Sequence, residues 1–138
     1  MSVTTSTVGE AGPAAIVAAT GFVLLAGFHV FLAAGVPWGR AAWGGAHDGL
    51  PSGLRTASGV AAVVMILSAL IVLGRAGSWG SMIPFGVFRW GTWALVGGLA
   101  LSALGNLASS STWERFLMGP VALVLAGLCF VVARAAVP

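Results

Sequence analysis

Four long apolar segments dominate this sequence and restrict what it can fold into. They run from about Pro13 to Val36, Thr56 to Gly74, Pro84 to Leu104 and Phe116 to Ala133. A helix needs roughly 20 apolar residues to cross a hydrocarbon core about 30 Å thick, so each segment is long enough to span a membrane. Backbone polar groups have no water to bond there, and alternating strand patterns are absent, so we expect four helices.

The composition agrees with a membrane protein. Of the 138 residues, 59% are apolar and only 7% are charged, whereas a soluble domain carries about a quarter of its residues as charged groups. Residues 1–12 contain Glu10 but no Lys or Arg, so they lack the basic region of a signal peptide, and we expect a short disordered tail. The prediction is a single all-α domain over residues 1–138, an up-down bundle of four transmembrane helices.

Tryptophan and arginine fall in the expected loops or near the helix ends, as in the aromatic belts of membrane proteins. The tryptophans are Trp38, Trp43, Trp79, Trp90, Trp93 and Trp113. Three arginines, Arg75, Arg89 and Arg134, belong to the end with both termini, and three belong to the other end, so the positive-inside rule predicts no orientation. Because the net charge of +3 comes from interfacial arginines, we expect the lipid bilayer as a partner and no nucleic acid.

Polar side chains gather at the end of the bundle formed by the first and third loops, which we call the two-loop end. They are Arg40, His47, Asp48, Arg55, Asn106, Glu114 and Arg115. Ionisable groups at membrane depth are costly and mark functional sites, which favours a site here with Asp48 and Glu114 paired to arginines. The alternative is that these are solvated loop charges, whose surface pairs contribute little to stability.

His29 lies roughly 10 Å below the end of the first helix, at about 1.5 Å per residue, where we expect a neutral imidazole. A neutral His can bind a metal, move a proton or orient a ligand, or it can simply bond a backbone carbonyl or Asn106 across a helix interface. No metal-ligand spacing, phosphate loop or nucleophile motif is present, so the residues indicate no metal and no cofactor and do not establish an enzyme. We expect Cys129 to be a buried, inert thiol.

The third helix carries small side chains at a spacing of four residues, which is typical of close helix packing. They are Ala94, Gly98 and Ser102, followed by Asn106. Ala122 and Ala126 of the fourth helix are expected to form the complementary face. The pattern leaves open whether this seam lies inside the bundle or between protomers.

Several segments of the two-loop end resemble a family of small four-helix bacterial membrane proteins whose function is uncharacterised. The residues that carry the resemblance are Gly35–Gly39, Trp43–Gly45, Leu50, Pro51, Leu54, Arg55, Ser58, Ser111–Arg115 and Met118–Pro120. The resemblance implies the same helix count and, together with the Ala, Gly and Arg-rich composition, a multi-pass location in the bacterial plasma membrane. It implies no activity, substrate or catalytic residue.

The leading functional hypothesis is a pocket at the two-loop end for a lipid or an amphipathic small molecule. Arg40, Arg55 and Arg115 would bind its head, Trp38 and Trp43 would cover its apolar part, and His29 with Asn106 would form the floor, beside His47, Asp48 and Glu114. One alternative is a homo-oligomeric transporter or channel. Proton-coupled export is disfavoured because Glu10, Asp48 and Glu114 all lie outside the predicted helices. Another alternative is an accessory subunit of a larger membrane complex.

Overall fold

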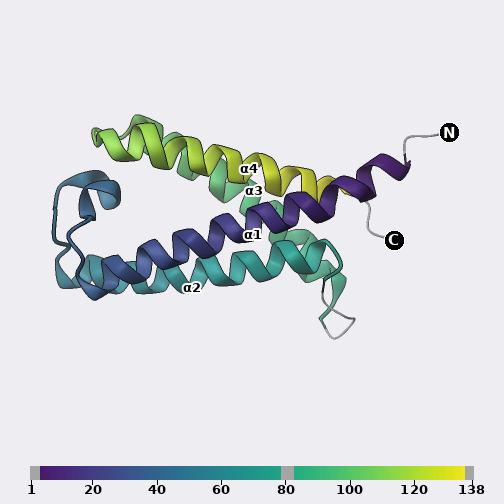
Figure 1. The fold of residues 1–138 in the computed structure, drawn as a ribbon, viewed down its shortest axis with the longest axis horizontal. Helices are drawn as coiled ribbons and strands as arrows, with labels where there is room; N and C mark the ends of the chain where they lie inside the picture. Colours follow the sequence, from purple (N-terminus) through teal and green to yellow (C-terminus); the bar gives the residue numbers. More distant parts are fainter. Residues whose placement is uncertain (1–3, 79–82, 136–138) are drawn as a thin grey trace.

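The computed structural model describes residues 4–78 and 83–135, with side chains from residue 12 onward. Its long helices are α1 (Thr4–Ala34), α2 (Ser52–Arg75), α3 (Phe85–Ala108) and α4 (Gly119–Arg134) (Figure 1). A π-helical turn, η3 (Glu114–Met118), leads directly into α4. Loop 1, between α1 and α2, contains two 3-10 turns, η1 (Gly39–Ala41) and η2 (Trp43–Gly45). The described residues contain no strand, and the predicted all-α four-helix fold is confirmed.

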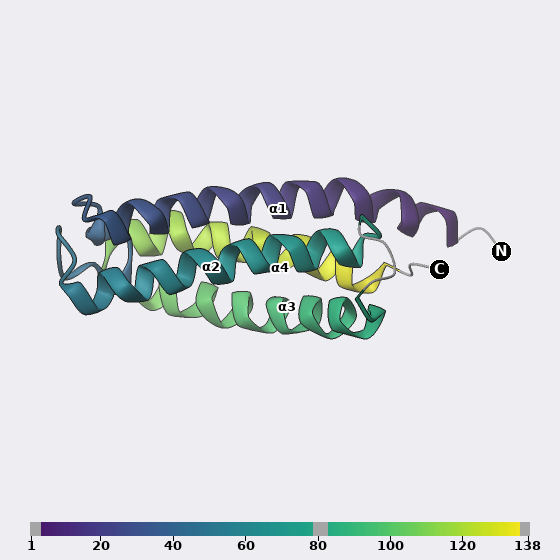
Figure 2. The ribbon, with the colours of Figure 1, turned by 90° about the horizontal axis from the view of Figure 1, so that it is seen from below.

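Within the described residues, four segments are long and apolar enough to cross a membrane: Gly12–Ala34, Ser52–Arg75, Phe85–Ala108 and Glu114–Arg134. The helices run alternately up and down, with the ends nearest the two termini at one end of the bundle and loops 1 and 3 at the other (Figure 2). The chain is therefore a multi-pass membrane protein with the predicted two-loop end.

The N-terminal part differs from the prediction. Residues 1–12 were expected to be a disordered tail, but α1 begins at Thr4; residues 1–3 lie outside the described part. Pro13 was the expected first residue because the apolar segment begins there. The structure instead carries Pro13 inside α1, so one missing backbone hydrogen bond does not end the helix.

The four helices form two hairpins arranged as a wedge. α1 packs along α2, and α3 packs along α4, while the hairpins meet through α1 with α4 and through α2 with α3. Figure 1 shows the pairs close together near the termini and apart at the two-loop end, where loop 1 turns into the opening.

The buried side chains of α1 are small where the hairpins are close together and larger where the hairpins are apart. Towards the termini, α1 buries Ala15, Ala18 and Ala19 in a core with Cys129 and Val132 of α4. Small residues let membrane helices approach closely. Towards the two-loop end, the inner face of α1 continues with larger side chains, namely Phe22, Leu25, Phe28 and His29. A second, smaller core of Leu32, Ala42 and Leu50 packs loop 1 onto the end of α1.

Arg75 fastens the terminus end of the bundle. Its side chain is buried, and Nη2 donates hydrogen bonds to the carbonyl oxygens of Ala133 (3.1 Å) and Ala135 (2.5 Å). The guanidinium carbon lies 4.9 Å from the ring centre of Phe85, at the start of α3. One cation thus links the end of α2 to the end of α4 and to α3, as expected of arginine near carbonyls that a helix C-terminus leaves unpaired.

The small-residue stripe of α3 does not pack against α4 inside the bundle, which was one of the two arrangements that the sequence left open. The α3 helix buries Phe88, Thr92, Leu99 and Ala103 instead. Ala94, Gly98 and Ser102 are exposed, and a Cβ atom at Gly98 would meet nothing within 4 Å. On the α4 side Ala122 and Ala126 are buried, and Cys129 is fully buried as predicted. The small residues of α3 therefore lie on an exposed face of the helix, which ends at Ser102 and Asn106.

We predict that Gly74→Ala destabilises the bundle, because a Cβ at this position would clash with the Phe88 ring where α2 crosses α3. Overpacking of this kind costs about 1–3 kcal/mol. The matched control is Gly59→Ala on the same helix, where a Cβ meets nothing within 4 Å. Thermal unfolding in detergent, followed by circular dichroism, should give a lower midpoint for Gly74→Ala only; equal midpoints would contradict this packing.

Candidate functional site

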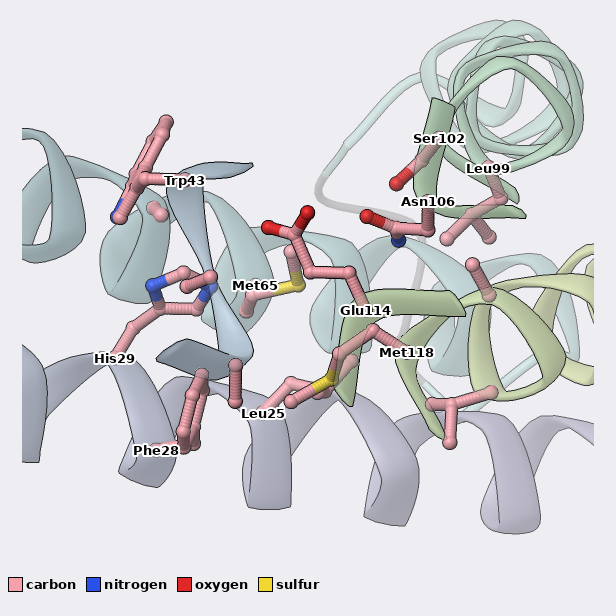
Figure 3. A pocket seen from close by; sticks show the side chains of 15 residues that line it. Leu25, Phe28, His29, Trp43, Met65, Leu99, Ser102, Asn106, Glu114 and Met118 are labelled. Carbon is pink, nitrogen blue, oxygen red and sulfur yellow. The ribbon is translucent and has the colours of Figure 1, made fainter. Parts of the chain in front are cut away.

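A hollow of about 270 Å³ lies between the two hairpins at the two-loop end (Figure 3). We call it the central hollow. All four long helices, η3 and loop 1 contribute to its wall, which is largely apolar. Its lining residues that carry a polar side-chain atom are His29, Trp43, Ser102, Asn106 and Glu114. A concave, mostly apolar site with a few convergent polar groups is the usual form of a small-molecule site.

His29 reaches the central hollow from α1. Its ring makes edge contacts with Phe28 and with Trp43, at centroid distances of 5.5 and 6.2 Å. Within the described part of the chain, the buried Nδ1 atom has no hydrogen-bond partner. A buried polar atom left unpaired costs about 1–3 kcal/mol, so the position favours a hydrogen-bonding ligand beside the ring.

Asn106 lies in the last turn of α3 and faces the same hollow (Figure 3). No hydrogen bond joins its side-chain amide to another described residue, and the bond to His29 that the sequence offered as one alternative is not formed. The same holds for the hydroxyl of Ser102, one helical turn away. An Asn amide offers two donors and an acceptor, so α3 presents unused hydrogen-bonding capacity to the hollow.

Glu114 is buried, with 6% of its surface exposed, whereas the sequence suggested a loop carboxylate paired with arginine. That pairing is wrong. Its Oε1 accepts a hydrogen bond from the backbone amide of Gly44 (2.8 Å), and its Oε2 accepts one from the hydroxyl of Ser109. A carboxylate has about four lone-pair sites, so acceptor capacity remains on the side that faces the hollow.

The local backbone explains why Glu114 points inward. Glu114 opens the π-helical turn, and its carbonyl accepts the amide hydrogen of Gly119, five residues later. The next residue, Pro120, has no amide hydrogen to donate to the carbonyl of Phe116, so regular α-helical bonding is interrupted there. Single π-helical turns of this kind are often found at functional sites.

Loop 1 covers the central hollow with Trp43. The indole Nε1 donates to Oγ of Ser58 on α2 (2.9 Å), and Oγ of Ser111 in loop 3 donates to the carbonyl of Arg40 (2.6 Å). Trp43 has a positive φ of 54°, which is a genuine outlier for a bulky side chain and occurs preferentially at functional sites. At Gly45 (φ +69°) a Cβ would lie 2.6 Å from Cβ of Ser111, so only glycine permits this approach.

The structure brings four of the ten predicted site residues to the central hollow: His29, Trp43, Asn106 and Glu114. The other six lie elsewhere at the two-loop end. Trp38, Arg40 and Asp48 line a separate hollow of about 400 Å³, the outer hollow, which also contacts Trp113. His47 is exposed to solvent, and Arg55 and Arg115 are exposed.

The three arginines of this end are already engaged. Arg40 forms an exposed ion pair with Asp48, and this bond holds the pKa of the Asp48 carboxyl below its ordinary value while it raises the pKa of Arg40. Nε of Arg55 donates to the carbonyl of Ala33 (2.9 Å) at the end of α1. Arg115 donates to the carbonyl of Ser109 from Nε (3.1 Å) and Nη2 (2.8 Å) just after α3. The expected cationic head-binding group therefore does not face the central hollow.

Sequence reasoning missed the apolar walls of the hollow and the residues that fix Glu114. Phe28, Met65 and Met118 line the hollow, but nothing distinguishes them from other apolar residues of a membrane helix. Ser109 and Gly44 hold the Glu114 carboxylate. The one available signal was the Glu at the start of an apolar segment beside a Ser-rich loop.

Comparison of the chain with protein-family models, with curated proteins and with solved structures found no match. Among the described residues, no group of three or more His, Cys, Asp and Glu side chains is placed to hold a metal ion.

We predict that Glu114→Ala loosens loop 1, because the Gly44 amide and the Ser109 hydroxyl lose their shared acceptor. Hydrogen bonds to charged groups contribute about 1.5–3 kcal/mol each, so amide exchange across residues 37–51 should accelerate roughly tenfold or more. Asp48→Ala, which removes an exposed carboxylate of the same loop, should change it little. Hydrogen exchange with mass spectrometry tests this, and equal exchange in the two variants would contradict the anchoring role of Glu114.

Proposed function

We propose that this protein binds an amphipathic small molecule or lipid from the surrounding membrane and holds its polar part in the central hollow. The observation that carries the proposal is the convergence of His29, Asn106 and Glu114, from three separate segments, on one largely apolar hollow. The buried Nδ1 of His29 and the amide of Asn106 have no partner among the described residues, and Glu114 keeps free lone pairs.

The energetics favour a ligand that supplies those missing partners. In a medium of low dielectric constant a polar group gains more from a hydrogen bond than it does in water, and it loses more when it stays unpaired. Binding sites for drug-sized ligands occupy about 300–1,000 Å³. The central hollow, at about 270 Å³, suits a head group or a small ring rather than a whole lipid.

We also propose that the membrane is the bacterial plasma membrane. The support is the resemblance of the two-loop segments to small bacterial membrane proteins, together with the Ala, Gly and Arg-rich composition. The four membrane-spanning helices agree with such a location without specifying it.

Trp43 provides a direct reporter of the hollow, since it lines the wall beside His29. In a variant with the other five of the six tryptophans replaced by Phe, bromo-octanol should quench Trp43 fluorescence and reach saturation. Loss of one net hydrogen bond, about 0.5–1.5 kcal/mol, should raise the half-saturating concentration roughly 2- to 12-fold in His29→Ala and in Asn106→Leu.

The matched control is His47→Ala, which removes the exposed histidine of loop 1, outside the central hollow. Its half-saturating concentration should equal that of the parent. Quenching that rises without saturation, or that is unchanged in His29→Ala and Asn106→Leu, would contradict the proposed binding site.

A further inference from the structure

The central hollow adjoins a larger apolar groove on the outer side of the bundle, between α1 and α4. This groove has a volume of about 530 Å³ and is lined by apolar side chains, Pro120 and Gly21. Leu24 (71% exposed) and Val124 (61% exposed) form part of its wall on the outer surface of the bundle. The groove and the central hollow share four wall residues, Leu25, Phe28, Met118 and Val121.

Phe28 and Met118 line the central hollow, the groove and the outer hollow, so these three spaces meet at a junction beside them. Methionine is unbranched and has three rotatable bonds, so it adapts readily to a neighbouring group. Further along the helices α1 and α4 meet closely, since a Cβ at Gly21 would lie 2.8 Å from Cδ2 of Leu125. The groove runs past this contact to Val17 and Leu128, and its other end reaches the junction at the two-loop end.

The charge around the central hollow restricts the head group. Glu114 is the only lining residue among the described ones that is an acid, and no arginine lines the hollow. Arg40, Arg55 and Arg115 are bound to Asp48, Ala33 and Ser109. A carboxylate or phosphate head would lie near Glu114 with no facing cation, which is unfavourable in a site of low dielectric constant. A hydroxyl or an amine would instead donate a hydrogen bond to Glu114.

We infer that the ligand is a single-chain amphiphile with an uncharged or cationic head that donates hydrogen bonds, as a long-chain alcohol or amine does. The head lies in the central hollow, and the chain passes between Phe28 and Met118 into the groove between α1 and α4. This inference rests on the proposed function and adds the ligand class and the place of its chain. Continuity of the groove with the polar hollow favours this occupant over a bilayer lipid that merely lies along the helices.

The head-group preference is tested by competition with bromo-octanol at Trp43. Hexadecanol, hexadecylamine and hexadecanoate share one chain length and differ only in the head. At equal mole fraction in the micelle, the alcohol and the amine should displace the probe at concentrations at least tenfold below the carboxylate. Glu114→Gln removes the negative charge but keeps the size of the side chain. It should reduce the ratio between the displacing concentrations of the carboxylate and of the alcohol or amine several-fold. Equal competition by all three in the parent protein would overturn the inference.

The path of the chain is tested by narrowing the groove. Val124→Phe places a larger side chain in the groove wall. Leu123→Phe does so at a neighbouring exposed position of α4 that lines neither of the two hollows nor the groove. In Val124→Phe, the concentration of hexadecanol that displaces half of the bromo-octanol should rise at least threefold. In Leu123→Phe it should stay the same, and the value for octanol should change little in either variant. An equal loss in both variants, or no loss in Val124→Phe, would overturn the inference.

The results of these experiments distinguish the proposed binding function from the inferred class of ligand. Saturable bromo-octanol binding that depends on His29 and Asn106, with no head or groove preference, would overturn the ligand class and leave the proposed function standing. Absence of saturable bromo-octanol binding would overturn both. Helical circular dichroism of each variant shows that the bundle is folded when its binding is measured.

Discussion

Two membrane helices can approach closely only where the side chains between them are small, and this constraint decides where the bundle is solid and where it is hollow. Ala15, Ala18 and Ala19 let α1 approach α4 near the termini, where Arg75 bonds the end of α4. Phe28 and His29 on the same helix replace them at the two-loop end. The hairpins diverge there, and the central hollow is the space that loop 1 does not fill.

The polar character of that hollow depends on how loop 1 is attached. Glu114 binds the Gly44 amide and the Ser109 hydroxyl, and Trp43 reaches across to Ser58. These bonds pair the polar groups of Trp43 and Gly44, through which loop 1 covers the hollow. They leave His29 Nδ1 and the side chain of Asn106 unpaired within the described residues, so the free hydrogen-bonding capacity points at the interior rather than at solvent. The Glu114 carboxylate and the His29 imidazole lie in one largely apolar wall. An amphiphile whose head donates hydrogen bonds would supply the partners that these groups lack.

The number, type and direction of the helices were predictable, because length and apolar composition suffice for membrane spans. The site was predictable only in part. His29 and Asn106 were recognisable as polar residues at membrane depth, but Glu114 was taken for a loop charge because the π-helical turn before Pro120 is not evident from hydropathy. Arg40, Arg55 and Arg115 do not line the central hollow, because carbonyls at helix ends and the nearby Asp48 bind them. The stripe of Ala94 and Gly98 suggested packing, yet periodicity does not say which face meets a neighbour.

The most direct test of the account is the nitrogen NMR spectrum of histidine-labelled protein in bilayers, recorded with and without hexadecanol. The chain has two histidines, one in the wall of the hollow and one in the exposed part of loop 1. A ligand head beside the imidazole should shift the ring nitrogens of His29 and leave those of His47 unchanged. Equal shifts at both residues, or none at His29, would contradict the claim that the central hollow is a binding site.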